Sequence, residues 1–330
     1  MIYQFDVKNI ICKYLFDLKD VINLYNLNKD HQNNIKVTNL YDIPEKYIKK
    51  LSQEIILSST QNSSHRYDLQ KKFHFIERLY AWNNDKIKNV NQIKETLKEL
   101  DCGSGNCGID QDGINELKLI KLCAYNNNKI KNINHMKEIL KELNCGGNCG
   151  IDQDGIIELK LVKLIVENND KIKNVNHMKE TLIELNCDGS NFLWVNYGIN
   201  QNGINELKLI KLSAWNNKKI ENVNHMKETL KILHCRGNSG IDQNGISKLN
   251  LIKLYASDNE KIKNANHMKN TLKKLYCSGN SGIDQNGILE LNLKELYAYR
   301  NEQIKDVNHM KNTLKKLNFV SISEFIKKVY

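Results

Sequence analysis

The sequence predicts an α+β protein in which a small helical module precedes a solenoid of about twelve 21-residue coils with a parallel sheet on its concave side. The string Gly-Ile-Asp-Gln-x-Gly-Ile recurs at Gly108, Gly150, Gly240 and Gly282, with a variant, Gly-Ile-Asn-Gln-Asn-Gly-Ile, at Gly198. Each block of 42 residues has two halves that share the pattern Leu-x-x-Leu-x-(Ala/Cys)-x-x-Asn-x-x-Ile. Residues 1–57 lack this pattern and carry apolar residues at helical spacing instead.

The N-terminal module, residues 1–57, is predicted to be helical. Asp6 is placed to cap a first helix, and Pro44 lies near the start of a third. The small polar run from Ser58 to Ser64 indicates a linker over residues 58–75. The predicted domains are therefore a module at 1–57, the linker, and the solenoid with its C-terminal cap at 76–330.

The coils begin at a regular series of positions, counted from the leading Leu or Ile of each copy. The starts are Ile76, Leu97, Leu119, Leu140, Leu161, Leu182, Leu209, Leu230, Leu251, Leu272, Leu293 and Leu314. The interval from Leu182 to Leu209 is 27 residues, which places six extra residues near 192–197. The last coil lacks the expected Asn and Ile, so we expect an apolar and basic cap over residues 319–330.

Within a coil, the pattern predicts which side chains face inward. Leu251, Leu254 and Ala256 lie on one side of a short extended segment, while Lys253 and Tyr255 alternate to the other. The Ala or Cys in the sixth place fits a narrow interior slot, where a free Cys acts as a small hydrophobe. The Asn in the ninth place is expected to be a buried amide that satisfies backbone groups of its own and the next coil. The ninth-place set is Asn127, Asn148, Asn169, Asn217, Asn238, Asn259, Asn280 and Asn301.

These repeats resemble the leucine-rich repeat over about three quarters of the chain. The resemblance implies a solenoid that recognises another protein on the concave face of its sheet. The Asn-, Lys- and Ile-rich copies also resemble the leucine-rich repeat proteins of giant viruses.

Residues 7–29 resemble an F-box, the short helical module that docks a protein on the Skp1 adaptor of a cullin ubiquitin ligase. The resemblance rests on Ile-Ile-x-Lys-Tyr-Leu, Leu-Lys-Asp-Val and Leu-Asn-Lys, in family order and spacing. The Leu-Pro opening of the family is missing, and His31 stands near where a bulky aromatic is common. The resemblance implies Skp1 contacts at Ile10, Ile11, Tyr14, Leu15, Leu18 and Val21. The alternative is a helical cap for the solenoid.

The amino-acid composition limits the classes of protein to which this chain can belong. The net charge is +11, with 40% hydrophobic and 26% charged residues, which is enough apolar mass for a folded core. No apolar run approaches the roughly 18 residues of a membrane span, and no signal peptide is recognised at the N-terminus. The nine cysteines are an odd number and several recur at one repeat position, so we expect reduced thiols in a cytoplasmic protein.

No catalytic or cofactor motif is recognised, and the repeated polar residues are interpreted structurally. The Asp-Gln pairs, such as Asp242-Gln243, recur only every second coil, which favours turn and cap roles over calcium binding. The recurring His-Met pairs are too far apart to share a metal ion, so each Met is predicted in the core and each His on the convex side. These histidines are His135, His177, His225, His267 and His309. The sequence thus predicts no enzyme, no cofactor and no metal.

The outward places of the strands are expected to bind a target. The third place alternates in sign through Glu99, Lys121, Glu142, Lys163, Glu184 and Lys211, which favours weak attraction between neighbouring strands. The target-binding set is formed by aromatic residues, including one in the insertion, because aromatic side chains supply most protein-binding hot spots. The set is Tyr80, Trp82, Tyr125, Trp194, Trp215, Tyr255, Tyr276, Tyr297 and Tyr299.

Lysines that recur along one loop edge raise the alternative of nucleic-acid binding, but lysine-rich turns are the simpler interpretation. These lysines are Lys129, Lys131, Lys171, Lys173, Lys261 and Lys263. The sequence therefore predicts a monomeric, non-enzymatic protein-recognition subunit. Resemblance makes it an F-box substrate receptor in the cytoplasm, of a host cell if the chain is viral. The other hypothesis is an interaction scaffold with no ligase link.

Overall fold

A computed structural model describes residues 77–85, 87–189 and 198–319. The predicted module at 1–57, the linker, the 192–197 insertion and nearly all of the C-terminal cap lie outside these residues. The chain divides into two compact units, Met1–Leu159 and Lys160–Tyr330, which are described separately.

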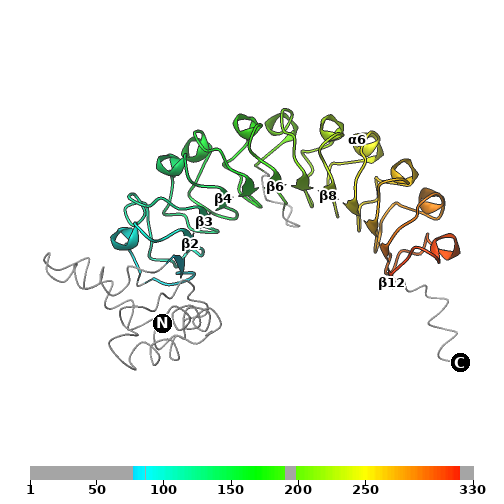
Figure 1. Cartoon of the computed structure of the whole chain (residues 1–330), viewed down its shortest axis with the longest axis horizontal. Helices are drawn as coiled ribbons and strands as arrows, with labels where there is room; N and C mark the ends of the chain where they lie inside the picture. Colours follow the sequence, from blue (N-terminus) through cyan, green and yellow to red (C-terminus); the bar gives the residue numbers. More distant parts are fainter. Residues whose placement is uncertain (1–76, 86, 190–197, 320–330) are drawn as a thin grey trace, which may run out of the picture. The chain divides into compact units, whose positions relative to one another are not determined.

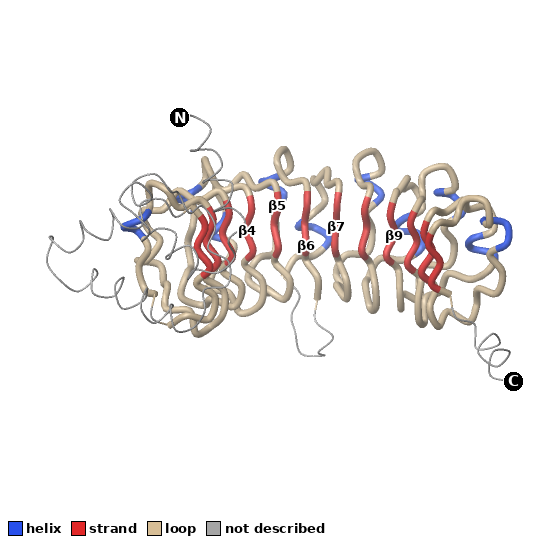
Figure 2. The backbone as a smooth tube through the Cα atoms, turned by 60° about the horizontal axis from the view of Figure 1, so that its bottom comes forward, coloured by secondary structure: helices blue, strands red, loops and turns tan. Residues whose placement is uncertain are grey.

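The described residues of both units form leucine-rich repeat solenoids, as the sequence predicts for the coils. The first contains β1 (Arg78–Tyr80), β2 (Glu99–Asp101), β3 (Lys121–Cys123) and β4 (Glu142–Asn144). The second contains β5 (Lys163–Ile165), β6 (Glu184–Asn186), β7 (Lys211–Ser213), β8 (Ile232–His234), β9 (Lys253–Tyr255), β10 (Lys274–Tyr276), β11 (Glu295–Tyr297) and β12 (Lys316–Asn318). Within each unit the strands pair in parallel in chain order (Figures 1 and 2).

Short helices lie on the opposite side of each coil from the strands (Figure 1). One class is centred on the His-Met pairs: η2 (Asn134–Met136), η4 (Asn176–Met178), η6 (Asn224–Met226), η7 (Asn266–Met268) and η9 (Asn308–Met310), with η1 (Asn91–Ile93) equivalent. The other includes η3 (Asp154–Ile156), η5 (Gln201–Gly203), α6 (Gln243–Ile246) and η8 (Asn286–Ile288). None exceeds four residues among those described, and none is long and apolar enough to cross a membrane.

The core is a stack of identical side chains from successive coils. In the second unit, Leu254 pairs in register with Leu233 and Leu275, and all three are fully buried. The sixth-place residues Ala256 and Cys277 are also fully buried, as predicted. Burial raises the pKa of the Cys277 thiol to about 12, so this cysteine stays protonated and acts as a core side chain.

The ninth-place asparagines follow the prediction in alternate coils only. Asn259 is 1% exposed; its Nδ2 donates to Cys235 O (2.7 Å) and Ile241 O (3.1 Å), and its Oδ1 accepts from Lys261 N (3.0 Å). The carbonyl partners belong to the preceding coil, so the expectation of bonds to the next coil was wrong. Asn127, Asn217 and Asn301 repeat the arrangement.

In the other coils the burial prediction was wrong, because Asn148, Asn238 and Asn280 are exposed. The residue after each asparagine takes the interior place instead. These residues are Cys149, Ser239 and Ser281, all fully buried. The Ser281 hydroxyl accepts a hydrogen bond from Ile283 N at 3.4 Å. This bond replaces only part of the three hydrogen bonds that the buried Asn259 side chain makes.

The Gly-Ile-Asp-Gln-x-Gly-Ile string stabilises neighbouring coils through a helix cap, side-chain hydrogen bonds to the next coil and a close approach of two backbones. The Asp242 carboxylate caps α6 by accepting from Gly245 N at 2.8 Å, as the turn and cap interpretation predicted. The Gln243 side chain accepts from Lys263 N and Asn264 N and donates to Asn264 O in the next coil. A Cβ on Gly245 would lie 2.0 Å from Glu221 O, so only glycine allows this approach of the two backbones.

Candidate functional site

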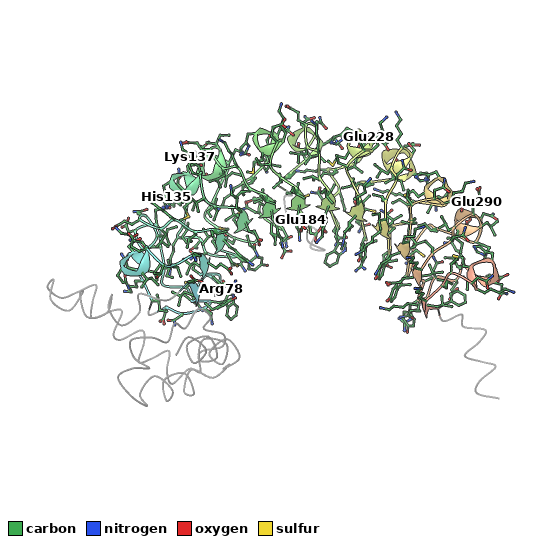
Figure 3. All side chains as sticks on the ribbon, viewed as in Figure 1. Arg78, His135, Lys137, Glu184, Glu228 and Glu290 are labelled. Atoms are coloured by element: carbon green, nitrogen blue, oxygen red, sulfur yellow. The ribbon has the colours of Figure 1, made fainter. Side chains whose placement is uncertain are left out.

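The sheet surface of each unit presents the third, fifth and seventh places of its coils. In β9 these outward residues begin with Lys253 and Tyr255, which flank the buried Leu254. The same alternation recurs in the other interior strands except β7, whose fifth-place residue Ser213 is buried, so the outward side chains form rows that run across the coils. Figure 3 shows Arg78 of the first unit and Glu184 of the second on the strand-lined side of their units.

The third-place row is a ladder of ion pairs. In the first unit Arg78 pairs with Glu99 (Nε to Oε1, 3.0 Å) and Lys121 with Glu142 (3.6 Å). In the second, Lys211 pairs with Glu184 at 3.5 Å. The alternation predicted from sequence therefore produces attraction between neighbouring strands, although exposed pairs of this kind contribute at most about 1 kcal/mol each.

The alternation ends in the second half of the second unit. The third places of β8, β9 and β10 are Ile232, Lys253 and Lys274. Lys274 pairs with Glu295 of β11 at 2.7 Å, and Lys316 of β12 lies 4.0 Å from the same carboxylate. Lys253 is in no ion pair with any described residue.

The fifth places of β8 to β11 form an aromatic ladder, defined as His234, Tyr255, Tyr276 and Tyr297. Successive ring centroids lie 3.9, 4.2 and 4.3 Å apart, with interplanar angles of 20°, 13° and 4°. Arg236, in the seventh place after β8, has its guanidinium carbon 5.1 Å from the Tyr255 centroid and 5.8 Å from that of Tyr276. The register of a parallel solenoid makes this stack possible, because equivalent residues of neighbouring coils lie directly side by side.

The structure brings only part of the predicted target-binding set together. Tyr255, Tyr276 and Tyr297 are adjacent and half-buried by their stacking. Trp215 and Tyr299 of the second unit, and Tyr80 and Trp82 of the first, are 43%, 42%, 41% and 60% exposed. Tyr125, in the first unit, is half-buried. Trp194 and the six residues predicted to contact Skp1 lie outside the described residues.

Two members of the site were missed by sequence reasoning, namely His234 and Arg236. The signal was available for His234, because it stands in the fifth place of its coil directly before three tyrosines in that place. The spacing also places Arg236 in the seventh row, but its position over two rings is seen only in the three-dimensional structure.

The imidazole of His234 experiences an electropositive environment. Burial lowers its pKa to about 4, with further lowering by Arg236, Lys211 and Lys253. Because the folded protein holds this proton less tightly than the unfolded chain, whose pKa is about 6.5, stability falls as the pH drops from about 6.5 toward 4.

His234→Tyr is expected to remove this part of the pH dependence, because tyrosine does not titrate there and continues the stack. The measurement is urea unfolding of parent and variant at several pH values from neutral to about 4. The difference in unfolding free energy between them should shift in favour of the variant as the pH falls. A constant difference across that window would contradict a buried, neutral His234.

The histidines of the His-Met pairs hold neighbouring coils together. Nε2 of His267 donates to Ile246 O at 3.1 Å, which assigns the proton of the neutral ring to that nitrogen. His135, His225 and His309 make the equivalent bond at 3.0–3.2 Å. The methionines beside them, Met136, Met178, Met226, Met268 and Met310, are buried as predicted. Among the described residues, no group of three or more His, Cys, Asp or Glu could hold a metal ion.

Two of the recurring loop lysines donate hydrogen bonds to backbone carbonyl groups. The Lys129 ammonium donates to Cys107 O at 2.6 Å, and that of Lys261 donates to Ser239 O at 3.0 Å, each in the preceding coil. These ammonium groups stabilise turns of the solenoid, which weakens the idea of a row of lysines aimed at phosphates.

Comparison with known proteins identified no matching family model and no matching curated protein. Among solved structures, the chain is similar to one described as a TLR13–ssRNA13 complex, with a TM-score of 0.46 and 19% identity over 90% of this chain and 45% of the other. It is also similar to the functional domain of InlJ from Listeria monocytogenes, described as including a cysteine ladder, with a TM-score of 0.41 and 19% identity over 74% of this chain and 63% of that one. The chain thus spans less than two thirds of either, and its repeat architecture follows from its own coils.

Proposed function

We propose that this chain is a non-enzymatic protein-recognition subunit that binds a partner protein on the strand-lined face of its repeats. The observation that best supports this proposal is the aromatic ladder. It fixes four rings on a rigid sheet and leaves their edges partly exposed. Ordered aromatic side chains lose little conformational entropy on binding, and they dominate protein interfaces energetically. The described residues include no candidate metal cluster, and the thiol pKa values for which a shift is resolved are raised by burial.

The ladder favours a protein partner over single-stranded nucleic acid. Proteins that bind single strands stack bases on the faces of their aromatic rings. Here successive centroids are 4.2 and 4.3 Å apart along the tyrosines, so each interior face is already covered by a neighbour and no base fits between. The rings are only partly buried, so their edges remain available for contact with a protein.

The finer proposal comes from the resemblance of residues 7–29 to an F-box. It makes the chain a substrate receptor that presents its target to a Skp1–cullin ubiquitin ligase, as a monomer in the cytoplasm, of the host if the chain is viral. Ile11, Leu15 and Leu18 would supply part of the Skp1 contact. The alternative is a scaffold without a ligase link, whose N-terminus is only a cap.

One capture experiment tests both levels. The full chain, a Tyr255→Ala/Tyr276→Ala variant and an Ile11→Ala/Leu15→Ala variant are used as baits in a eukaryotic cell lysate, with quantitative mass spectrometry of the bound proteins. We expect the tyrosine variant to lose the target and keep Skp1, and the N-terminal variant to lose Skp1 and keep the target. Each variant is thereby the folding control of the other, supplemented by melting curves.

The outcomes separate the hypotheses. Absence of Skp1 from the parent's captured proteins, or equal Skp1 capture by the N-terminal variant, favours the scaffold without a ligase link. Captured proteins that are unaffected by the tyrosine variant, with both proteins folded, contradict recognition through the ladder.

A further inference from the structure

We propose that the aromatic ladder recognises an acidic segment of the partner protein, whose carboxylates meet Arg236, Lys253 and Lys274. The inference rests on the proposed function and adds to it the chemistry of the partner.

The first observation is an unbalanced set of charges around the ladder. Arg236 lies over the rings of Tyr255 and Tyr276, and Lys253 stands in the third place beside Tyr255. Neither is in an ion pair with another described residue. The nearby carboxylate of Glu295 pairs with Lys274 at 2.7 Å and with Lys316 at 4.0 Å. Lys253 attracts Glu295, and Arg236 attracts Asp188, only at longer range than an ion pair.

The pKa of His234 responds to the same cations. Besides burial, three cations lower the pKa of His234: Arg236, Lys211 and Lys253. Carboxyl groups stand in the outward rows of the coils that precede the ladder. There Glu167 and Asp188 occupy the seventh places after β5 and β6, and burial raises the pKa of both carboxyl groups, with Asp188 raising that of Glu167 further. Arg236 also acts on Asp188, whose pKa it lowers in part, so the field of this guanidinium reaches back to the coil of β6, while Lys253 stands beside Tyr255 without an ion pair.

The groups available at the ladder suit carboxylates. Lysine and arginine donate charge-assisted hydrogen bonds, and tyrosine hydroxyls add neutral donors at the edges of the stacked rings. The apolar ring edges exclude water around such bonds, which strengthens them. An extended acidic segment with apolar residues between its carboxylates would match both properties.

The test uses a random peptide library displayed on phage and selected on the full chain. Selected peptides are then synthesised with a fluorescent label, and their affinity is measured by anisotropy at low and at physiological salt. We expect enrichment of Asp and Glu, and a loss of at least about tenfold in affinity for Lys253→Glu/Lys274→Glu.

The matched control is Lys227→Glu/Lys248→Glu, which changes the net charge equally on the helix side of the coils. Lys227 is the C-cap residue of η6, beside Glu228, which Figure 3 shows on that outer side. Lys248 follows α6, and its backbone amide donates to the Asn224 side chain. This control should keep the parent's affinity, and melting curves check that both variants fold.

Each alternative result has a distinct meaning. Peptides need the ladder if they do not bind the Tyr276→Ala variant. If such peptides carry no excess of acidic residues, or if they still bind the Lys253→Glu/Lys274→Glu charge-reversal variant, the acidic partner is overturned and the proposed function stands. Failure to select any ladder-dependent peptide overturns both. Tighter binding of a labelled oligothymidylate than of any selected peptide, lost in the same reversal, replaces the acidic segment with a nucleic-acid backbone.

Discussion

Asn259→Ala is expected to lower the free energy of unfolding by about 3 kcal/mol, because the change removes the side-chain partner of two buried carbonyl groups and of one part-buried backbone amide. The amide of Asn259 donates to Cys235 O and Ile241 O and accepts from Lys261 N. The methyl group of alanine has no polar atom, so it can make none of these hydrogen bonds. Equilibrium unfolding in urea of the full chain measures the change.

The repeat supplies the control. Asn280 occupies the ninth place of the next coil and is exposed. Asn280→Ala should therefore alter stability by no more than about 0.5 kcal/mol, as is usual for surface changes. Similar losses in the two variants would show that the amides are equivalent and would contradict the alternation of the two halves.

The same pair of residues shows where sequence reasoning reached its limit. Apolar periodicity fixed the strands and the inward Leu side chains correctly, because one coil must bury its apolar edge against the next. The shared pattern, however, averages two halves that differ by one residue in the turn. In the coil of Asn259 the ninth place enters the core, whereas after Asn280 it is the tenth, Ser281, that does so. Polar periodicity alone does not distinguish these cases.

The sequence predicted which residues share an outward row of the candidate site, but it did not predict which of their side chains are in contact. Sequence spacing placed Tyr255, Tyr276 and Tyr297 in one outward row, and the parallel register then stacks them. The extension of the stack by His234 and the position of Arg236 depend on ring orientation, which no spacing rule contains. Tyr80 and Trp82 belong to the same predicted set but lie in the other unit, so they make no contribution to the ladder described.

Leu254→Ala is expected to destabilise the protein by about 2–5 kcal/mol, through lost transfer free energy and the cavity that remains. Leu254 is fully buried at the centre of β9. Its register partners Leu233 and Leu275 belong to rigid parallel strands, which limits how far the neighbours can close the space. Thermal unfolding followed by circular dichroism provides the measurement.

Ile252→Ala is the matched control, since Ile252 lies two residues earlier in the same coil and is 42% exposed. It removes the apolar side chain at a place that water already reaches, so its effect should be much smaller. Because each coil contacts only its neighbours, a cavity at Leu254 weakens the interfaces with the coils on both sides. If the unit unfolds cooperatively, the whole transition moves to lower temperature; if these interfaces open separately, an earlier transition appears. Equal melting of Leu254→Ala and the parent would exclude the register in which the fourth-place leucines form the core.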